Sequence, residues 1–169
     1  MDIDESPEKT AEREVAINTA LDSLECKLDN EEKAKLAKDL HSYEILVALL
    51  SSSNGKAPGP DGIPYELWKT LHQRDKNLEK ENKEGFKVTK AMKIVFNDIE
   101  NNGLKGGTDF TKAWMCLIYK KGDITEIKNY RPISVLNIDY KLFTKALQAK
   151  LAVVAPKIIH KNQASFMKN

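Results

Sequence analysis

Apolar residues recur every three or four positions in five stretches of the chain. This spacing places them on one face of an α-helix, so each stretch predicts a helix with one buried side. Asn30, Ser42 and Asn137 can cap three of these helices, and Pro64 suits the first position of another. Gly103 suits the end of a fifth. The expected helices lie within residues 30–40, 42–50, 64–71, 88–102 and 137–155.

Two further apolar stretches lack the helical spacing. The run "WMCLIY" at 114–119 is apolar on both faces and short for a buried helix, which predicts a strand covered on two sides. In "YRPISVL" at 130–136, Ile133 and Val135 share one face, and Pro132 favours an edge or a strand start. The polar segment 120–129 joins the two, so we expect an antiparallel hairpin. These elements predict an α+β fold, mostly helical with a small antiparallel sheet or hairpin.

Two segments carry too little apolar content to pack. Residues 1–29 are expected to form an acidic, partly disordered leader, and residues 72–84 predict a solvated helix extension or an exposed insertion. The folded domain is therefore expected within residues 30–169. Because the chain ends just after "QASF", which is interpreted as a short strand, we expect this domain to be part of a larger one.

The segment "NGKAPGPDG" at 54–62 places glycines and prolines around one lysine. A Walker phosphate loop ends in Gly-Lys-Ser/Thr, whereas Gly55-Lys56 comes first here and alanine follows. Pro58 and Pro60 also lack the backbone N–H groups from which such a loop is built. A stiff turn is the better interpretation. If Gly59 needs a positive φ in this turn, Gly59→Val should be destabilising by about 1 to 3 kcal/mol.

Composition and charge narrow the possible functions. The chain has 169 residues, is 41% hydrophobic, and its longest apolar runs are six residues, which is too short to span a membrane. Cys26 and Cys116 are far apart and no histidine lies at metal-ligand spacing, which argues against a disulfide or a zinc site. From residue 105 onward there are 12 basic and 4 acidic side chains, a local charge of +8. Such an excess favours a polyanionic partner.

The expected hairpin concentrates part of this charge. Lys120 and Lys121 leave the first strand where Arg131 enters the second, so three cations meet at one end of the hairpin. Lysine supplies a point charge for phosphate, and the planar guanidinium can both bind phosphate oxygens and lie against a base. On charge alone, an ordinary solvated loop remains the commoner explanation for such a segment.

Three ordered blocks favour a specific family. The blocks "NGKAPGPDGIP", "LIYKKGDITEIKNYRPISVLNIDYKLF" and "IIHKNQASF", with their spacing, resemble the N-terminal part of the reverse transcriptases of non-LTR (LINE-type) retrotransposons. The resemblance runs from about residue 30 to the end. It implies the fingers portion of a right-hand polymerase, whose partners are an RNA template, a DNA primer and a deoxynucleoside triphosphate. It also implies an intracellular protein, found in the cytoplasm and nucleus.

The resemblance carries expected roles onto individual residues. Arg131 is similar to the fingers arginine that contacts the incoming nucleotide, and Lys120 or Lys121 resembles the lysine that reaches its triphosphate. Which lysine does so depends on the strand register, which the sequence leaves open. The residues expected to contact template or primer are Lys56, Asp61, Gln163 and Phe166.

The expected catalytic palm is missing from the sequence. Polymerases of this kind hold two Mg²⁺ ions with carboxylates of the palm. Two sequence motifs supply these carboxylates, and neither motif is present here. We therefore predict no catalytic residue, metal ligand or cofactor in this chain, and no polymerase activity from it alone. The missing palm and thumb segment is a further expected partner. The alternative is a non-catalytic relic of a decayed element that binds nucleic acid or protein.

Overall fold

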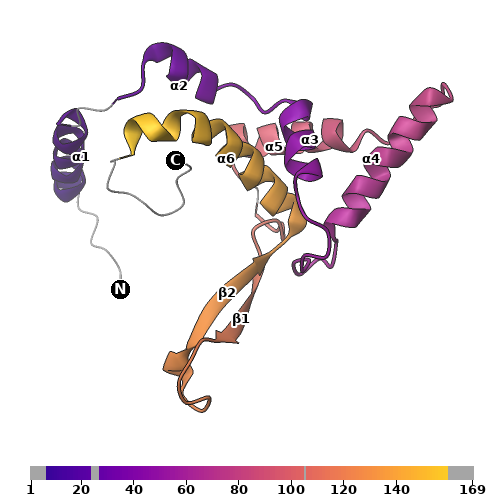
Figure 1. Ribbon diagram of the computed structural model, residues 1–169. Coiled ribbons are helices and arrows are strands. Elements are labelled where there is room, and N and C mark those ends of the chain that lie inside the picture. The colour runs from indigo at the N-terminus through magenta and orange to yellow at the C-terminus, as the bar shows by residue number, and fades with distance from the viewer. Residues whose placement is uncertain (1–6, 24–26, 105, 160–169) are drawn as a thin grey trace. The chain divides into compact units, whose positions relative to one another are not determined.

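A computed structural model describes residues 7–23, 27–104 and 106–159 (Figure 1). Within these residues the elements in chain order are α1 (Pro7–Asp22), α2 (Asn30–Leu36), α3 (Ser42–Leu50), α4 (Tyr65–Lys80), α5 (Val88–Asn102), β1 (Ala113–Tyr119), a 3-10 helix (Ile127–Asn129), β2 (Tyr130–Leu136) and α6 (Ile138–Ile158). The predicted α+β fold, mostly helical with one antiparallel hairpin, is confirmed. Residues 38–151 form one compact unit, and the described parts of 1–37 and 152–169 form another.

Helix α5 supplies the centre of the core in the unit 38–151. Its Val88, Met92 and Phe96 are buried at the spacing that the sequence predicted. The ring of Phe96 lies 5.1 Å from that of Phe143, and Phe110 packs beside both. Apolar residues from α3, α4 and α6, with one residue before α3, complete the cluster: Leu40, Ile45, Ala48, Leu49, Tyr65, Ile138, Leu142 and Ala146.

A buried asparagine joins α5 to the segment before α3. The side chain of Asn97 accepts a hydrogen bond from the Leu40 N–H at 2.8 Å and donates one to the Leu40 carbonyl at 3.1 Å. Asn97 is 8% exposed and Leu40 is fully buried. The amide therefore satisfies both backbone groups of a residue that has no ladder or helix partner for them.

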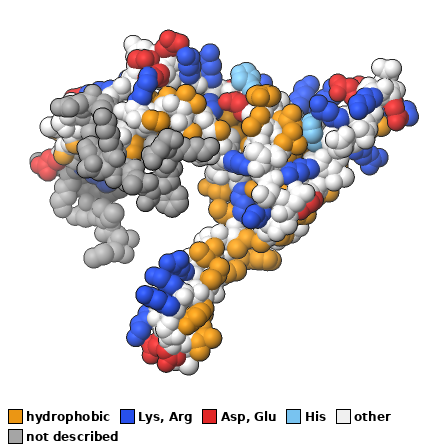
Figure 2. Space-filling view, in the orientation of Figure 1, with side chains coloured by type: hydrophobic (Ala, Val, Ile, Leu, Met, Phe, Trp, Pro, Cys, Tyr) orange, Lys and Arg blue, Asp and Glu red, His pale blue; other side chains and the backbone are white. Residues whose placement is uncertain are grey.

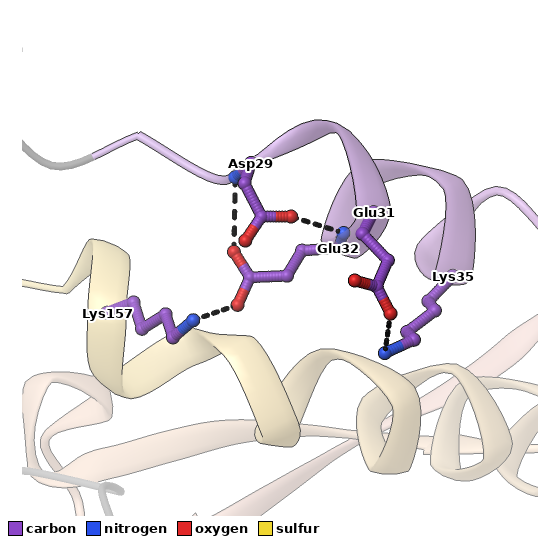
Figure 3. A network of polar contacts seen from close by, with 5 residues as sticks. All are labelled: Asp29, Glu31, Glu32, Lys35 and Lys157. Carbon is purple, nitrogen blue, oxygen red and sulfur yellow. Dashed lines mark hydrogen bonds and ion pairs between the residues drawn. The ribbon is translucent and has the colours of Figure 1, made fainter.

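Helix α2 begins with a capping box in the other unit (Figure 3). The Asp29 carboxylate accepts from the Glu32 N–H at 2.8 Å, and the Glu32 carboxylate accepts from the Asp29 N–H at 3.1 Å. Lys157 of α6 forms an ion pair with the second oxygen of Glu32. The Glu32 N–H is the main reason that the pKa of Asp29 lies below its usual value. This exposed network orders the first turn of α2.

Several helix limits differ from those predicted. The caps before α2 and α3 are Asp29 and His41, one residue earlier than expected, because Glu32 and Glu44 reach back to these backbone N–H groups. Gly103 ends α5 with a φ of 71°, as predicted. Helix α6 continues to Ile158, past the proline at 156 where its apolar stripe was expected to end.

Two segments outside the predicted helices are also helical. Helix α1 occupies most of the segment interpreted as a partly disordered leader, with Pro7 at its first position. Every described side chain of α1 is exposed, so local propensity is the source of this helix. Helix α4 runs on to Lys80, which selects the solvated extension over the exposed insertion. In the described part of the chain, no helix combines the length and apolar content that crossing a bilayer requires.

Candidate functional site

The hairpin register settles which lysine shares a face with Arg131. Ile118 is paired with Arg131 and Tyr119 with Tyr130, and the Lys120 N–H donates to the Asn129 carbonyl at 2.8 Å. Lys120 therefore extends the ladder by one residue. Because side chains alternate between the two faces of a strand, Lys120 lies on the Arg131 side, two residues beyond Ile118. Lys121 falls in the loop that follows.

In one view of the hairpin, its cations gather apart from much of its apolar surface. Figure 2 shows lysine and arginine side chains gathered along one side of the hairpin and hydrophobic side chains along the other. The nearest acidic groups, Asp123 and Glu126, lie at the tip, and Glu126 lies 3.4 Å from Lys128. Among the described residues, no carboxylate forms an ion pair with Lys120 or Arg131. Both side chains are exposed and free to bind an external anion.

Two tyrosines hold the loop that carries Lys121. The Tyr119 hydroxyl donates to the Gly122 carbonyl at 2.6 Å, and the Tyr130 hydroxyl donates to the Ile124 carbonyl at 2.9 Å. The two rings contact edge to face, with centroids 5.7 Å apart. Thr125 donates to Asp123 from both its N–H and its hydroxyl, and these bonds lower the pKa of Asp123. The loop is therefore ordered by its own hydrogen bonds.

Gly122→Ala is expected to loosen this loop. Gly122 has a φ of +97°, and a Cβ there would lie 2.7 Å from the Asn129 side chain. Strain of this kind costs about 1 to 3 kcal/mol. Amide hydrogen exchange should quicken across residues 121–129 and stay unchanged in α5. Gly107→Ala is the control, since its φ is +91° but the added Cβ meets open space. Unchanged exchange in the Gly122 variant would contradict the assigned strain.

Strand β1 is not covered on two sides, and this prediction is wrong. Every residue of β1 is exposed, including Trp114 at 59% and Met115 at 72%. The hairpin is a two-stranded sheet, and the described residues place no layer over either of its faces. The continuous apolar run correctly predicted a strand, but its cover does not come from the described part of this chain.

The turn at 54–62 is fixed on Asn137, the residue before α6. Gly59 is buried, and a Cβ there would lie 2.3 Å from the Asn137 side chain. The Asn137 amide accepts from the Asp61 N–H at 3.2 Å and donates to the Asp109 carbonyl at 3.1 Å. Lys141 donates to the Ala57 carbonyl at 3.1 Å. The stiff turn predicted from the sequence thus lies against the start of α6.

Charged groups of both signs surround this turn. Burial raises the pKa of the Asp139 carboxyl. The hydrogen bond from the Tyr140 N–H lowers this pKa in part, and the nearby charge of Asp61 raises it. Burial also lowers the pKa of Lys141, which Asp61 partly offsets. Lys56 is exposed in the same turn. Lys56 is therefore the cation of the turn that is most open to an external phosphate.

The predicted site residues fall into two groups. The hairpin brings Lys120 and Arg131 to one face with Lys121 beside them, and the turn holds Lys56 and Asp61. The other two predicted contacts, Gln163 and Phe166, lie outside the described residues. Sequence reasoning missed Asn137 as the anchor of the turn, because the only signal at that position was its suitability as a helix cap.

The described residues do not fit a magnesium site. In residues 7–23, 27–104 and 106–159, no three His, Cys, Asp or Glu side chains gather where they could hold a metal ion. Asp61 and Asp139 are close enough to influence each other, but Lys141 adds a positive charge beside them.

The chain is similar to part of a transposon-encoded protein. Over 138 residues, or 78% of the chain, it is 30% identical to the "Transposon TX1 uncharacterized 149 kDa protein" of Xenopus laevis. The matched region is 9% of that protein's length. The chain matches no family model. The similarity supports the descent of this chain from a transposon.

Proposed function

We propose that the chain is the fingers portion of a non-LTR retrotransposon reverse transcriptase, which contacts the template and the incoming nucleotide. Three sequence blocks resemble that family, and the similarity to a transposon protein supports the origin. The observation that carries the proposal is the hairpin register, because it puts Lys120 and Arg131 on one face without a carboxylate partner among the described residues.

The proposed chemistry uses these two side chains differently. The Arg131 guanidinium can donate two parallel hydrogen bonds to phosphate oxygens or lie flat on the base, whereas the Lys120 ammonium acts as a point charge on the triphosphate. The hydrogen bonds of Tyr119 and Tyr130 hold the loop, so less entropy is lost when the phosphate binds. Lys121 contributes long-range attraction from the loop.

The proposed path of template and primer passes the turn at 54–62. Lys56 supplies its phosphate contact, and Asp61 fixes the turn by accepting from the Ile63 N–H at 2.9 Å. Gln163 and Phe166 complete the proposed contacts with the RNA template and DNA primer. A palm and thumb segment would bring Mg²⁺ and its carboxylates, and would cover the exposed apolar faces of the hairpin. Such a protein would act in the cytoplasm and nucleus.

Arg131→Ala and Lys120→Ala should weaken nucleotide use in a polymerase assembled from this chain and a family palm and thumb. Each removes charge-assisted hydrogen bonds worth about 1.5 to 3 kcal/mol, which raises the KM for deoxynucleoside triphosphate about 10- to 100-fold. Template affinity should change much less. Lys121→Ala is the matched control and should raise the KM only a few-fold. A larger effect on template than on nucleotide would reject the assigned roles.

The second candidate function is non-catalytic binding of nucleic acid. It is favoured by the net charge of +8 from residue 105 onward. The chain alone should then yield no primer-extension product with Mg²⁺ supplied. It should bind single-stranded RNA with an affinity that falls steeply with salt, as filter binding would measure. An affinity indifferent to salt would eliminate this candidate.

A further inference from the structure

Two lysines from different helices converge on one buried serine. Lys69 of α4 donates to the Ser52 carbonyl at 2.5 Å and to the Asn54 side chain at 2.7 Å. Lys145 of α6 donates to the Ser52 hydroxyl at 2.9 Å. Because both ammonium groups bind atoms of a single residue, the two positive charges are held close together at the end of α3. Ser52 itself is only 7% exposed.

This pair has little compensation from acidic groups. Among the described residues, neither ammonium group has a carboxylate oxygen within 4.0 Å. Burial lowers the pKa of Lys145, and the like charge of Lys69 lowers it further. Two acidic groups lie in this region, and both already accept hydrogen bonds from the backbone. Glu66, whose pKa the charge of Lys69 helps to lower, accepts from the Gly55 N–H at 2.6 Å. Glu44, which lines the same hollow as Lys145, accepts from the His41 N–H at 2.7 Å. The site would therefore gain from an added anion.

Capping of α3 explains only part of this arrangement. The C-terminal end of a helix carries about half a negative charge, so one lysine would more than balance it. The second lysine is left in excess. An ammonium group has three donors, and the structure uses two on Lys69 and one on Lys145. Both side chains are half-buried, so their spare donors can still reach a ligand at the surface.

A hollow between α3 and α6 begins at Lys145. It has a volume of about 160 Å³, and its walls include Val47, Ala48 and Ala149. Tyr43 stands at its rim and is 73% exposed. Glu44, Ser51 and Gln148 complete its lining, and Lys145 is the one lysine of the pair that lines it. An aromatic ring and small apolar side chains beside a cation are features that bind a base and its phosphate in single-stranded nucleic acids.

We propose that Lys69 and Lys145 bind one phosphate of a single-stranded nucleic acid, and that the adjoining base lies in the hollow against Tyr43. The paired charges without carboxylate partners favour a nucleic acid over a protein helix as the ligand. A protein helix would need a longer apolar surface without cations. The site uses no residue of the hairpin, and it does not use Lys56, the proposed phosphate contact of the 54–62 turn. It can therefore be true whether or not the reverse transcriptase proposal holds.

Binding of an oligouridylate to the whole chain at several salt concentrations tests the proposal. Removing one lysine–phosphate interaction should reduce the slope of log affinity against log salt by about 0.7 for a single strand. Because both lysines contact the same phosphate in the proposed site, Lys69→Gln with Lys145→Gln should flatten the slope by about 0.7 and weaken binding at low salt. The matched control is Lys76→Gln with Lys80→Gln, two exposed lysines of the same α4, which should leave the slope nearly unchanged.

Two further variants separate binding from folding. Lys69→Arg with Lys145→Arg keeps the charge and should keep the slope, even if packing changes slightly. Tyr43→Ala should weaken binding about 5- to 100-fold without changing the slope, since base stacking is worth about 1 to 3 kcal/mol. An unchanged slope in the glutamine variant would overturn the proposal, as would an equal decrease in the Lys76 and Lys80 control. Weakened binding confined to Arg131→Ala would place the RNA on the hairpin instead.

Discussion

Gly59→Val should destabilise the unit 38–151 by about 3 kcal/mol, at the upper end of the cost of overpacking a tight site. A Cβ at Gly59 would lie 2.3 Å from the Asn137 side chain, 2.4 Å from its backbone nitrogen and 2.5 Å from its Cα. Two of these atoms are backbone and cannot swing away. The turn would have to leave α6, which would break the bond from the Asp61 N–H to Asn137.

The sequence predicted this sensitivity for a different reason. Gly59 is not among the described glycines with a positive φ, so the condition of a left-handed backbone is not met, and close approach to Asn137 is the reason instead. Gly55→Ala is therefore the informative control. Gly55 has a φ of +69° but open space around it, so its substitution costs only backbone strain, about 1 kcal/mol. Pro58→Ala should be milder still.

Urea unfolding would measure these differences through the fluorescence of Trp68, which is partly buried and packs against the core of this unit. The midpoint should fall most for Gly59→Val, less for Gly55→Ala and least for Pro58→Ala, with similar denaturant slopes. A Gly59→Val protein that unfolds at the same urea concentration as the Gly55→Ala protein would show that the turn does not lie against Asn137.

Periodicity predicted the hairpin and five of the helices because each depends on local pattern. It could not predict the register, since β1 is apolar on both faces and a shift of β1 by one residue leaves its pattern almost unchanged. The loop provides what the pattern lacks. Tyr119 and Tyr130 pair their rings and bind backbone carbonyls on the loop, which favours one alignment of the strands. With that alignment Lys120, and not Lys121, shares a face with Arg131.

The buried asparagines were beyond sequence reasoning. Asn97 and Asn137 look like ordinary surface residues of a helix and a cap, because the groups they satisfy come from segments that are 57 and 76 residues away in the chain. The lysine pair on Ser52 has the same origin, with one member 93 residues away. In each case a polar side chain joins distant segments, and composition or spacing does not encode such a contact.

The hairpin also shows where local pattern and packing disagree. Its apolar run predicted a covered strand, yet Leu117, Ile118 and Tyr119 are all exposed. Exposed apolar surface of this extent is typical of an interaction site. Ile118 shares the face of Lys120 and Arg131, whereas Leu117 and Tyr119 lie on the opposite face. One hairpin could therefore contact phosphate with one face and a protein layer with the other.

Asn97→Ala should lower the stability of the same unit by about 2 to 5 kcal/mol. The substitution leaves the N–H and the carbonyl of Leu40 buried without partners, and each unpaired group costs about 1 to 3 kcal/mol. Asn101→Ala is the matched control, because Asn101 is an exposed residue of the same helix and alanine is the better helix former. Its unfolding midpoint should be unchanged or slightly higher.

Asn97→Asp would test the donor separately. The carboxylate can still accept from the Leu40 N–H at 2.8 Å, but it faces the Leu40 carbonyl where the amide now donates at 3.1 Å. Burial and this repulsion raise the folded-state pKa of the new carboxyl above the unfolded value of about 3.9. The folded state then binds more protons, so the variant's stability is fully present below the unfolded pKa and falls as pH rises through the folded pKa. A deficit relative to the parent that does not grow with pH between about 4 and 7 would show that Asn97 makes no buried contact with Leu40.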